Sequence, residues 1–456
     1  MAGRHSHRKV SGADQKLSEV IVIGGGLAGS EASWQIAERG IRVILYEMRP
    51  GKMTPAHRTG LMAELVCSNS LGSDIPDRAS GLLKAELRAL RSLILSCADA
   101  HAVPAGGALA VDRDAFACCV TQKIENHPLI EVRREEVKEI PTGHPVIIAS
   151  GPLTSEDFTR ALTELTGGKH LSFYDAMAPI VHVDSIDSSK VFRGSRYGKG
   201  GDDYINCPLS REEYDRLVDA LLTAETIPLR DFERADRNFF EACLPVEVIA
   251  SRGRDALAYG PLRPVGLRDP RTGQRPAAVV QLRQDNLAGT LYNMVGFQTN
   301  LRWKEQERVF RMIPGLERAE FVRFGQMHRN TFIDSPALLH PTMQLRTRET
   351  VFFGGQIAGT EGYVASTASG LVAGLNAARH VRREPPVVPP ATTMVGALCR
   401  YVSSPQIKEF QPMKPNFGLL PPLETPVKKK EMHKAMSRRA MEALQTFIQE
   451  ILGPSA

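Results

Sequence analysis

Long apolar runs are missing from this chain of 456 residues. No segment approaches the roughly twenty consecutive apolar residues that are needed to cross a bilayer. Residues 1–18 are polar and basic and lack the apolar centre of a secretory signal. We therefore expect a cytoplasmic protein without membrane attachment, and a disordered tail over residues 1–18.

Cysteine is sparse and strong net charge is absent. The seven cysteines form an odd, scattered set, with no C-x-x-C pair and no Cys/His cluster at the spacing of metal ligands. We therefore expect neither a disulfide framework nor a metal site. The formal net charge of +6 permits a polyanionic partner but does not require one.

Glycine, in contrast, is concentrated in a few motifs, and the first lies near the chain start. Residues 19–23 read as a buried strand that runs directly into a G-x-G-x-x-G turn and a helix. A pyrophosphate would sit on the N-terminus of that helix, where free N–H groups favour negative charge. The residues predicted to contact the dinucleotide are Gly24, Gly25, Gly26, Leu27, Ala28 and Gly29.

The acidic residue expected after such a turn is Glu47, at the end of a second strand over residues 41–46. Its carboxylate is placed to accept hydrogen bonds from an adenosine ribose and would repel a 2'-phosphate. The dinucleotide held by this unit should therefore not be NADP.

Two later glycine-rich elements resemble FAD-binding elements of two-dinucleotide-fold flavoproteins, and this resemblance favours FAD over NAD. Residues 145–151 form a buried strand that ends in a small-residue turn, and residues 351–363 lead from a strand through a glycine-rich loop to a helix. Gln356 stands where many flavoproteins have an aspartate that binds the ribityl chain, so that contact must differ. The contacts predicted here come from Gly151, Gly354, Gly355, Gln356, Gly359 and Tyr363.

Together the three elements predict an α/β fold. We expect a Rossmann-type FAD-binding domain of the two-dinucleotide, glutathione-reductase-like kind, formed by residues 19–171 and 326–456. An inserted α+β domain for substrate would occupy residues 172–325.

Arginine gathers between residues 252 and 283, where seven arginines face two acidic residues in loop-rich sequence. Such a cluster is either a solvated basic face or a surface that binds phosphates. The candidates for phosphate contacts are Arg252, Arg254, Arg263 and Arg283.

Several longer runs resemble a single enzyme family. They are GGGLAGSEA from Gly24, EMRPGKMTPAH from Glu47, AELVCSNSLG from Ala63, PAGGALAVDR from Pro104, ASGPLTS from Ala149, FFEACLPVE from Phe239, MHRNTF from Met327, GGQIAGTEGY from Gly354 and FQPMKPNFG from Phe410. The family is that of the folate- and FAD-dependent tRNA (uracil-5-)-methyltransferases. The resemblance covers roughly residues 20–439.

This resemblance implies an activity and its partners. Such enzymes methylate C5 of uridine at position 54 in the tRNA T-loop, with the carbon taken from methylenetetrahydrofolate. Reduced FAD would supply the hydride, and NADPH or NADH would reduce the FAD. The resemblance implies neither a metal nor a required protein partner.

Uracil C5 is a poor nucleophile, so this chemistry needs a thiolate that adds to C6. Two cysteines have unusual surroundings: Cys67 lies in a polar turn, and Cys243 lies between an aromatic pair and a proline. The resemblance implies catalytic roles for both. We assign the attack on the base to Cys243 and a role near the flavin to Cys67, and the order of the two remains open.

The resemblance also implies a folate site at His328 and Arg329. The His328 imidazole would stack on a pterin ring; the alternative is a histidine that caps a loop. Arg329 would hold either a glutamate tail of the folate or a tRNA phosphate.

Two other functions compete with this prediction. One is the related class of FAD-dependent proteins that modify wobble uridine, which carry a long additional C-terminal helical domain that we do not expect here. The other is a non-catalytic, flavin-containing RNA-binding protein, which would need neither cysteine.

Overall fold

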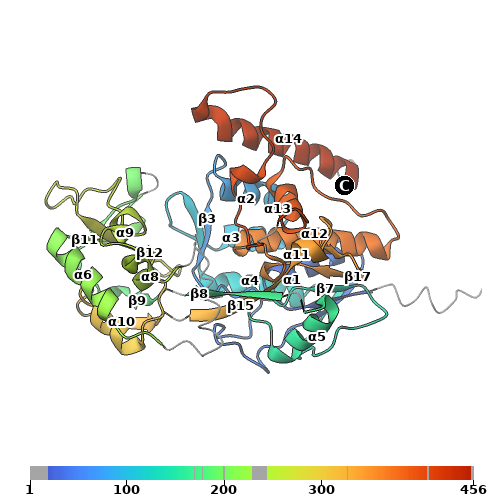
Figure 1. The fold of residues 1–456 in the computed structure, drawn as a ribbon, viewed down its shortest axis with the longest axis horizontal. Helices are drawn as coiled ribbons and strands as arrows, with labels where there is room; N and C mark the ends of the chain where they lie inside the picture. Colours follow the sequence, from blue (N-terminus) through green and yellow to red (C-terminus); the bar gives the residue numbers. More distant parts are fainter. Residues whose placement is uncertain are drawn as a thin grey trace, which may run out of the picture.

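The computed structural model describes residues 19–168, 170–176, 178–198, 201–227, 244–325, 327–407 and 410–452, with the backbone alone for residues 170–176, 327–330 and 452. Two six-stranded sheets organise the chain (Figure 1). The first sheet has the order β16 (Gln344–Leu345), β17 (Arg348–Phe353), β7 (Val146–Ile148), β1 (Glu19–Ile23), β2 (Arg42–Tyr46) and β6 (Ile130–Arg133).

The central strands of the first sheet are parallel. Ile21 of β1 is aligned with Ile44 of β2 on one side and with Val146 of β7 on the other, and β17 pairs in parallel with β7. These short strands are almost continuously apolar, as expected of parallel strands that are covered on both faces. The sheet therefore joins the chain start to residues beyond 340.

Two helices pack closely beside this sheet. They are α1 (Leu27–Ala37), which follows β1, and α12 (Tyr363–Val381), which follows β17. Glycines permit the contact: a Cβ atom on Gly370 would lie 2.3 Å from the carbonyl oxygen of Ala28, and one on Gly374 would lie 2.7 Å from that of Ala32. The two helices that follow the glycine-rich turns are thereby locked together.

Further elements cover this unit, and α14 crosses its top above α2 and α13 (Figure 1). The Ser437 hydroxyl on α14 donates to the carbonyl oxygen of Pro76, 3.0 Å away, just before α2. These elements are β3 (Ser70–Ser73), α2 (Ala79–Ala89), α3 (Leu93–Ala100), β4 (Ala102–Val103), β5 (Ala108–Val111), α4 (Arg113–Glu125), α5 (Glu156–Thr166), α11 (Ser335–Leu338), α13 (Met394–Val402) and α14 (Met432–Leu452).

The second sheet is antiparallel wherever its pairing is described. Its order is β10 (Phe192–Arg193), β11 (Tyr204–Leu209), β12 (Ala278–Gln284), β13 (Leu291–Met294), β9 (Ile180–His182) and β14 (Phe321–Arg323). Its helices are α6 (Arg211–Thr223), α8 (Val246–Ser251), α9 (Ala256–Tyr259) and α10 (Trp303–Phe310). The unit has its own apolar core, which includes Tyr214, Phe297 and Phe310.

The chain passes between the two units through an antiparallel pair of strands, β8 (His170–Ala176) and β15 (Met327–Ile333). The expected fold class is confirmed: a parallel Rossmann-type sheet carries an inserted α+β unit. The limits at 171/172 and 325/326 fall within or beside these strands and stay a prediction. No helix in the described ranges is long and apolar enough to span a membrane.

Candidate active site

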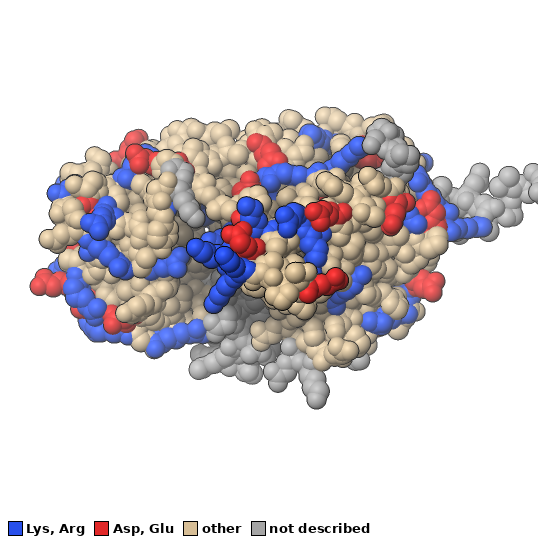
Figure 2. Space-filling view, turned by 90° about the horizontal axis from the view of Figure 1, so that it is seen from above, with Lys and Arg blue, Asp and Glu red and all other residues tan. Residues whose placement is uncertain are grey.

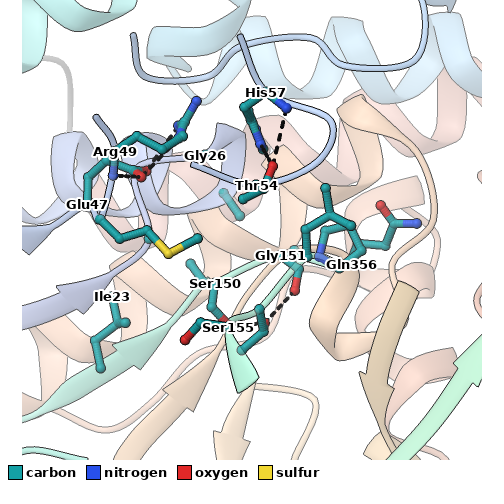
Figure 3. Close-up of a pocket in the computed structure, with 18 of the residues that line it drawn as sticks. Ile23, Gly26, Glu47, Arg49, Thr54, His57, Ser150, Gly151, Ser155 and Gln356 are labelled. Atoms are coloured by element: carbon teal, nitrogen blue, oxygen red, sulfur yellow. Dashed lines mark hydrogen bonds and ion pairs between the residues drawn. The ribbon is translucent and has the colours of Figure 1, made fainter. Parts of the chain in front are cut away.

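The three glycine-rich elements line one cavity of about 1060 Å³. In Figure 3, Glu47 and Arg49 lie on one side of this cavity, Gln356 lies on the other, and Ser150 and Gly151 lie between them. Of the predicted cofactor residues, those that line it are Gly24, Gly26, Leu27, Ala28, Glu47, Gly151, Gly355, Gln356 and Tyr363.

The first turn leaves backbone open toward this cavity. Gly26 is the N-cap residue of α1, and a Cβ atom there would meet nothing within 4 Å. Gly24 has a φ of 103°, and a Cβ atom on it would lie 2.5 Å from the carbonyl oxygen of Ala149. Gly24 thus fits the first turn against the second element, while Gly26 leaves room for a ligand to approach the helix N-terminus.

Four predicted glycines lie behind the cavity wall and shape it without lining it. Gly25 donates its backbone N–H to Glu47, whereas the other three permit close packing. A Cβ atom on Gly29 would lie 1.8 Å from the Gly24 carbonyl oxygen, and one on Gly354 would lie 3.1 Å from the Gly370 Cα. A Cβ atom on Gly359 would lie 2.3 Å from the Phe410 ring.

Glu47 is buried at the cavity wall and is held by an arginine that the sequence did not suggest. Arg49 donates Nε to Oε1 at 2.9 Å and Nη2 to Oε2 at 3.0 Å, and the Gly25 N–H donates to Oε2 at 2.9 Å. Burial alone would raise the pKa of Glu47, but the hydrogen bonds and charge of Arg49 outweigh it and lower the pKa. The carboxylate therefore stays ionised where a ribose would bind.

Gln356 lies in the short 3-10 helix η4 (Gln356–Ala358) and lines this cavity and the next one. Its amide Nε2 donates to Glu361 Oε2 at 2.7 Å, which fixes the side chain. Beyond it, Gly362 has a φ of 95° and starts α12. The N-terminus of α12 thus lies between the two cavities.

A second cavity of about 1260 Å³ adjoins the first and contains Cys67. The residues that line both cavities are Val66, Pro152, Leu153, Gln356 and Tyr363. The Tyr363 hydroxyl accepts the backbone N–H of Cys67 at 2.8 Å and that of Ser68 at 3.2 Å. Burial raises the pKa of the Tyr363 phenol, so it remains a neutral acceptor beneath the cysteine.

Three largely buried arginines support the loop that carries Cys67. Arg113 donates to the Leu65 carbonyl oxygen at 2.6 Å, and Arg323 donates to that of Val66 at 2.6 Å. Arg283 donates to Asn69 Oδ1 at 3.0 Å. All three guanidinium groups interact electrostatically with Cys67. Nearby positive charge stabilises thiolates, so the loop offers surroundings suited to a reactive cysteine.

Burial and neighbouring charges shift the pKa values of these arginines and of their acidic neighbour. Asp285 forms an ion pair with Arg113 at 2.9 Å, and burial raises the pKa of this carboxyl even though Arg113 opposes that effect. Burial, followed by repulsion from Arg113 and Arg58, lowers the pKa of Arg323 to about 10. The site therefore holds three arginines close to Cys67.

The other predicted residues are distributed as follows. Cys243 lies outside the described residues. His328 and Arg329 lie in β15, and only their backbone is described. That strand runs beside the site, because the Thr331 N–H donates to the carbonyl oxygen of Pro152 at 2.9 Å.

The arginines predicted to bind phosphate fall into two groups. Arg283 is buried against the Cys67 loop, whereas Arg252, Arg254 and Arg263 are exposed on the second unit. Arg254 forms ion pairs with Asp215 and Asp219 on α6. In the described part of the chain, no group of three or more His, Cys, Asp and Glu side chains could hold a metal ion.

The fold and the paired cavities define a class: an α/β protein with an FAD-type Rossmann unit and an inserted second unit. Aquifex aeolicus GidA, in its form II crystal, shares this fold with a TM-score of 0.71 at 16% identity, over 97% of this chain and 75% of that one. The model of the family described as "Glucose inhibited division protein A" matches residues 19–385.

Curated relatives identify the particular family. A Heliobacterium modesticaldum protein is 59% identical over 95% of this chain and 98% of its own length. A Moorella thermoacetica protein is 60% identical over 93% and 97% of the two chains. Both are named methylenetetrahydrofolate–tRNA-(uracil-5-)-methyltransferase TrmFO. The chain belongs to this TrmFO family.

Proposed function

We propose that this protein transfers a one-carbon unit from methylenetetrahydrofolate to C5 of uridine 54 in the tRNA T-loop, with reduced FAD as the source of hydride. The observation that carries the proposal is the junction of two cavities: an FAD-type cavity opens beside a cavity that contains a cysteine surrounded by arginines. A relative that is 59% identical to the chain is named for the transfer from methylenetetrahydrofolate to uracil C5 of tRNA, which supports that part of the proposal.

The residues of the first cavity fit FAD. Gly26 and Gly151 leave backbone exposed with no atom where a Cβ would stand, and Glu47 is held ionised at the wall. Gly26 and the N-terminus of α1 would hold the pyrophosphate, and Glu47 would hold the adenosine ribose. When bound, FAD supplies the hydride that completes the methyl group.

The chain's own contribution begins with a thiol. A thiolate adds to C6 of the uracil ring, and C5 then attacks the carbon carried by the folate. Loss of the C5 proton and departure of tetrahydrofolate would leave an exocyclic methylene on the base. This methylene would accept the hydride, and release of the thiolate from C6 would restore the ring. We assign the addition to C6 to Cys243 and a role beside the flavin to Cys67. The three arginines and Tyr363 would hold the Cys67 loop in place throughout.

The folate and the electron source complete the proposal. His328 would stack on the pterin ring, and Arg329 would bind a glutamate tail or a phosphate. NADPH or NADH would reduce the flavin while bound transiently against its face, because the sequence contains no second dinucleotide turn. A tRNA substrate is consistent with a cytoplasmic location.

The tRNA backbone would lie across the exposed arginines of the second unit. Arg252, Arg254 and Arg263 are the proposed phosphate contacts, and Arg283 acts instead from the interior through Asn69. On the face shown in Figure 2, Lys and Arg side chains extend from the end of the molecule formed by this unit toward its middle. The target base must leave its stack for C5 and C6 to be reached.

The test is transfer of label. We expect the purified protein, given unmodified tRNA, methylene-labelled folate, NADPH and a metal chelator, to place label in 5-methyluridine at position 54. A substrate in which position 54 is cytidine should take up none. Label that stays out of the wild-type tRNA, in protein that retains FAD, would contradict the proposed reaction.

The two cysteines provide matched variants. We expect Cys67→Ala and Cys243→Ala each to abolish label transfer, whereas Cys207→Ala, at a buried position of the second unit, should leave transfer largely unchanged. Normal transfer by Cys243→Ala would shift the attack on C6 to Cys67. Normal transfer by both variants would contradict a catalytic role for either cysteine.

A further inference from the structure

A column of three aromatic rings extends from the core of the second unit to its surface. Phe321 and Phe324 are stacked, with ring centroids 5.5 Å apart and planes 20° apart. Phe324 and Trp303 are stacked in turn, at 5.6 Å and 13°. At the inner end, Phe321 contacts Phe310, which is fully buried. We call Trp303, Phe324 and Phe321 the aromatic column.

The outer end of the aromatic column is open. Trp303 is the first residue of α10, and 58% of its surface is exposed. An indole ring left this exposed forgoes much of the free energy that its burial would contribute. The Trp303 ring is stacked on Phe324, and its exposed surface is available for stacking with another flat ring.

The hollow beside the aromatic column carries positive charge. Arg58 and Arg323 line this hollow of about 500 Å³, and none of the described residues that line it is acidic. Burial, followed by repulsion from Arg113 and Arg58, lowers the pKa of Arg323, so these guanidinium groups lie close enough to interact. Flat rings beside arginines are the combination that binds unpaired nucleotides: the bases stack, and the phosphates meet the cations.

The hollow lies next to the cavity that contains Cys67. Ala56 lines both, and Arg323 reaches from the strand that precedes Phe324 to the carbonyl oxygen of Val66, the residue before Cys67. A base stacked on Trp303 would therefore lie close to a base inserted in the cavity that contains Cys67. Extrusion of one base leaves its neighbours without a stacking partner, which a protein ring can replace.

We propose that Trp303, at the end of the aromatic column, stacks on an unpaired tRNA base near the target uridine, and that Arg58 contacts the adjoining phosphate. This inference rests on the proposed function for the choice of tRNA. The observations that carry it are the stacked rings, the exposed indole, the arginines of the hollow and the shared wall with the Cys67 cavity.

The chain has two tryptophans, so Trp303 can be observed directly. The other, Trp34, lies in α1 against His127. In a Trp34→Phe variant that retains FAD, we expect unmodified tRNA to quench the remaining indole fluorescence, with a midpoint equal to the Kd from filter binding. tRNA binding without any change in Trp303 fluorescence would overturn the proposal.

Substitutions supply the second measurement. Trp303→Ala should raise Kd and KM for tRNA about tenfold, within the range for loss of one stacked base, whereas Trp303→Phe should stay within about threefold. Leu222→Ala on α6, with Leu222 49% exposed, is the matched control and should change neither value. FAD content and thermal midpoint verify that each variant is folded.

The outcomes separate the two proposals. Quenching of Trp303 fluorescence by tRNA, without any methyl transfer by the wild type, would contradict the proposed reaction and still support stacking on Trp303. Methyl transfer by the wild type, together with an unchanged Kd for tRNA in Trp303→Ala, would contradict stacking on Trp303 and still support the proposed reaction. Equal losses in Trp303→Ala and Trp303→Phe would show that the indole acts other than by stacking.

Discussion

Among single side chains, Glu47 shows what sequence reasoning reached and what it missed. Its place at the end of the second strand predicted a carboxylate near the dinucleotide, and the structure places it on the cavity wall. Arg49, two residues on, gave no signal, because a charged residue after a strand is usually solvated. Only the fold shows that Arg49 is buried against the carboxylate.

Glu47→Gln tests the ionised carboxylate. The change removes a charge that would accept hydrogen bonds from ribose, so we expect the Kd of FAD to rise about tenfold, as for the loss of one hydrogen bond to a charged group. Fluorescence titration of the apoprotein with FAD measures it. Glu136→Gln is the control, since Glu136 lines the same cavity but pairs with Lys52 near the surface. Equal effects of the two changes would argue against a specific contact.

Among elements, the glycine motifs predicted strand, turn and helix correctly because the constraint is local: a turn at positive φ and a close helix contact need glycine. The support of the Cys67 loop is not local. Tyr363 is 296 residues from Cys67, and Arg323 is 257 residues from Val66. No spacing rule covers such distances, so only Arg283 and Tyr363 were singled out beforehand, each for a different role.

Contacts between helices also carry a pH dependence. Glu86 on α2 accepts the backbone N–H groups of Met394 at 2.7 Å and Val395 at 2.8 Å, at the N-terminus of α13. Burial raises the pKa of Glu86 to about 7, although these hydrogen bonds oppose the shift. The folded state therefore holds this proton more tightly than the unfolded state does between pH 4.5 and about 7.

This raised pKa fixes the sign of the expected effect. The stability that Glu86 contributes is fully present below pH 4.5 and declines as pH rises through about 7, by roughly 3 kcal/mol in total. We expect denaturant titrations at several pH values to show this slope in the wild type and a shallower one in Glu86→Gln. A parallel pair of curves would show that Glu86 does not titrate in this range.

For the whole molecule, the fold class could be predicted because three glycine-rich elements of the Rossmann unit occur along the sequence in the expected order. The aromatic column could not, since Trp303 and Phe324 are separated in the chain and neither lies in a recognisable motif. The exposed arginines were found as a cluster, but the sequence did not reveal that Arg283 is buried within it.

Charge on the second unit should appear in the salt dependence of tRNA binding. Removal of one cation that binds a phosphate reduces the slope of log K against log salt by about 1. We expect Arg263→Gln to produce that reduction, whereas Arg308→Gln, whose arginine pairs with Glu305 on α10, should leave the slope unchanged. The measurement is the tRNA binding constant of each variant at several salt concentrations between low and physiological salt. An unaltered slope in Arg263→Gln would contradict the proposal that the tRNA backbone contacts Arg263.

The wall of the first cavity also bears on biosynthesis. Because Gly355, Gln356 and Tyr363 line the same cavity as the first glycine turn, the wall of this cavity is complete only after the start of α12 has left the ribosome. The inserted unit is translated entirely before that point. We therefore expect flavin to load late, after the inserted unit has been translated, because a chain that ends before α12 lacks one wall of the cavity.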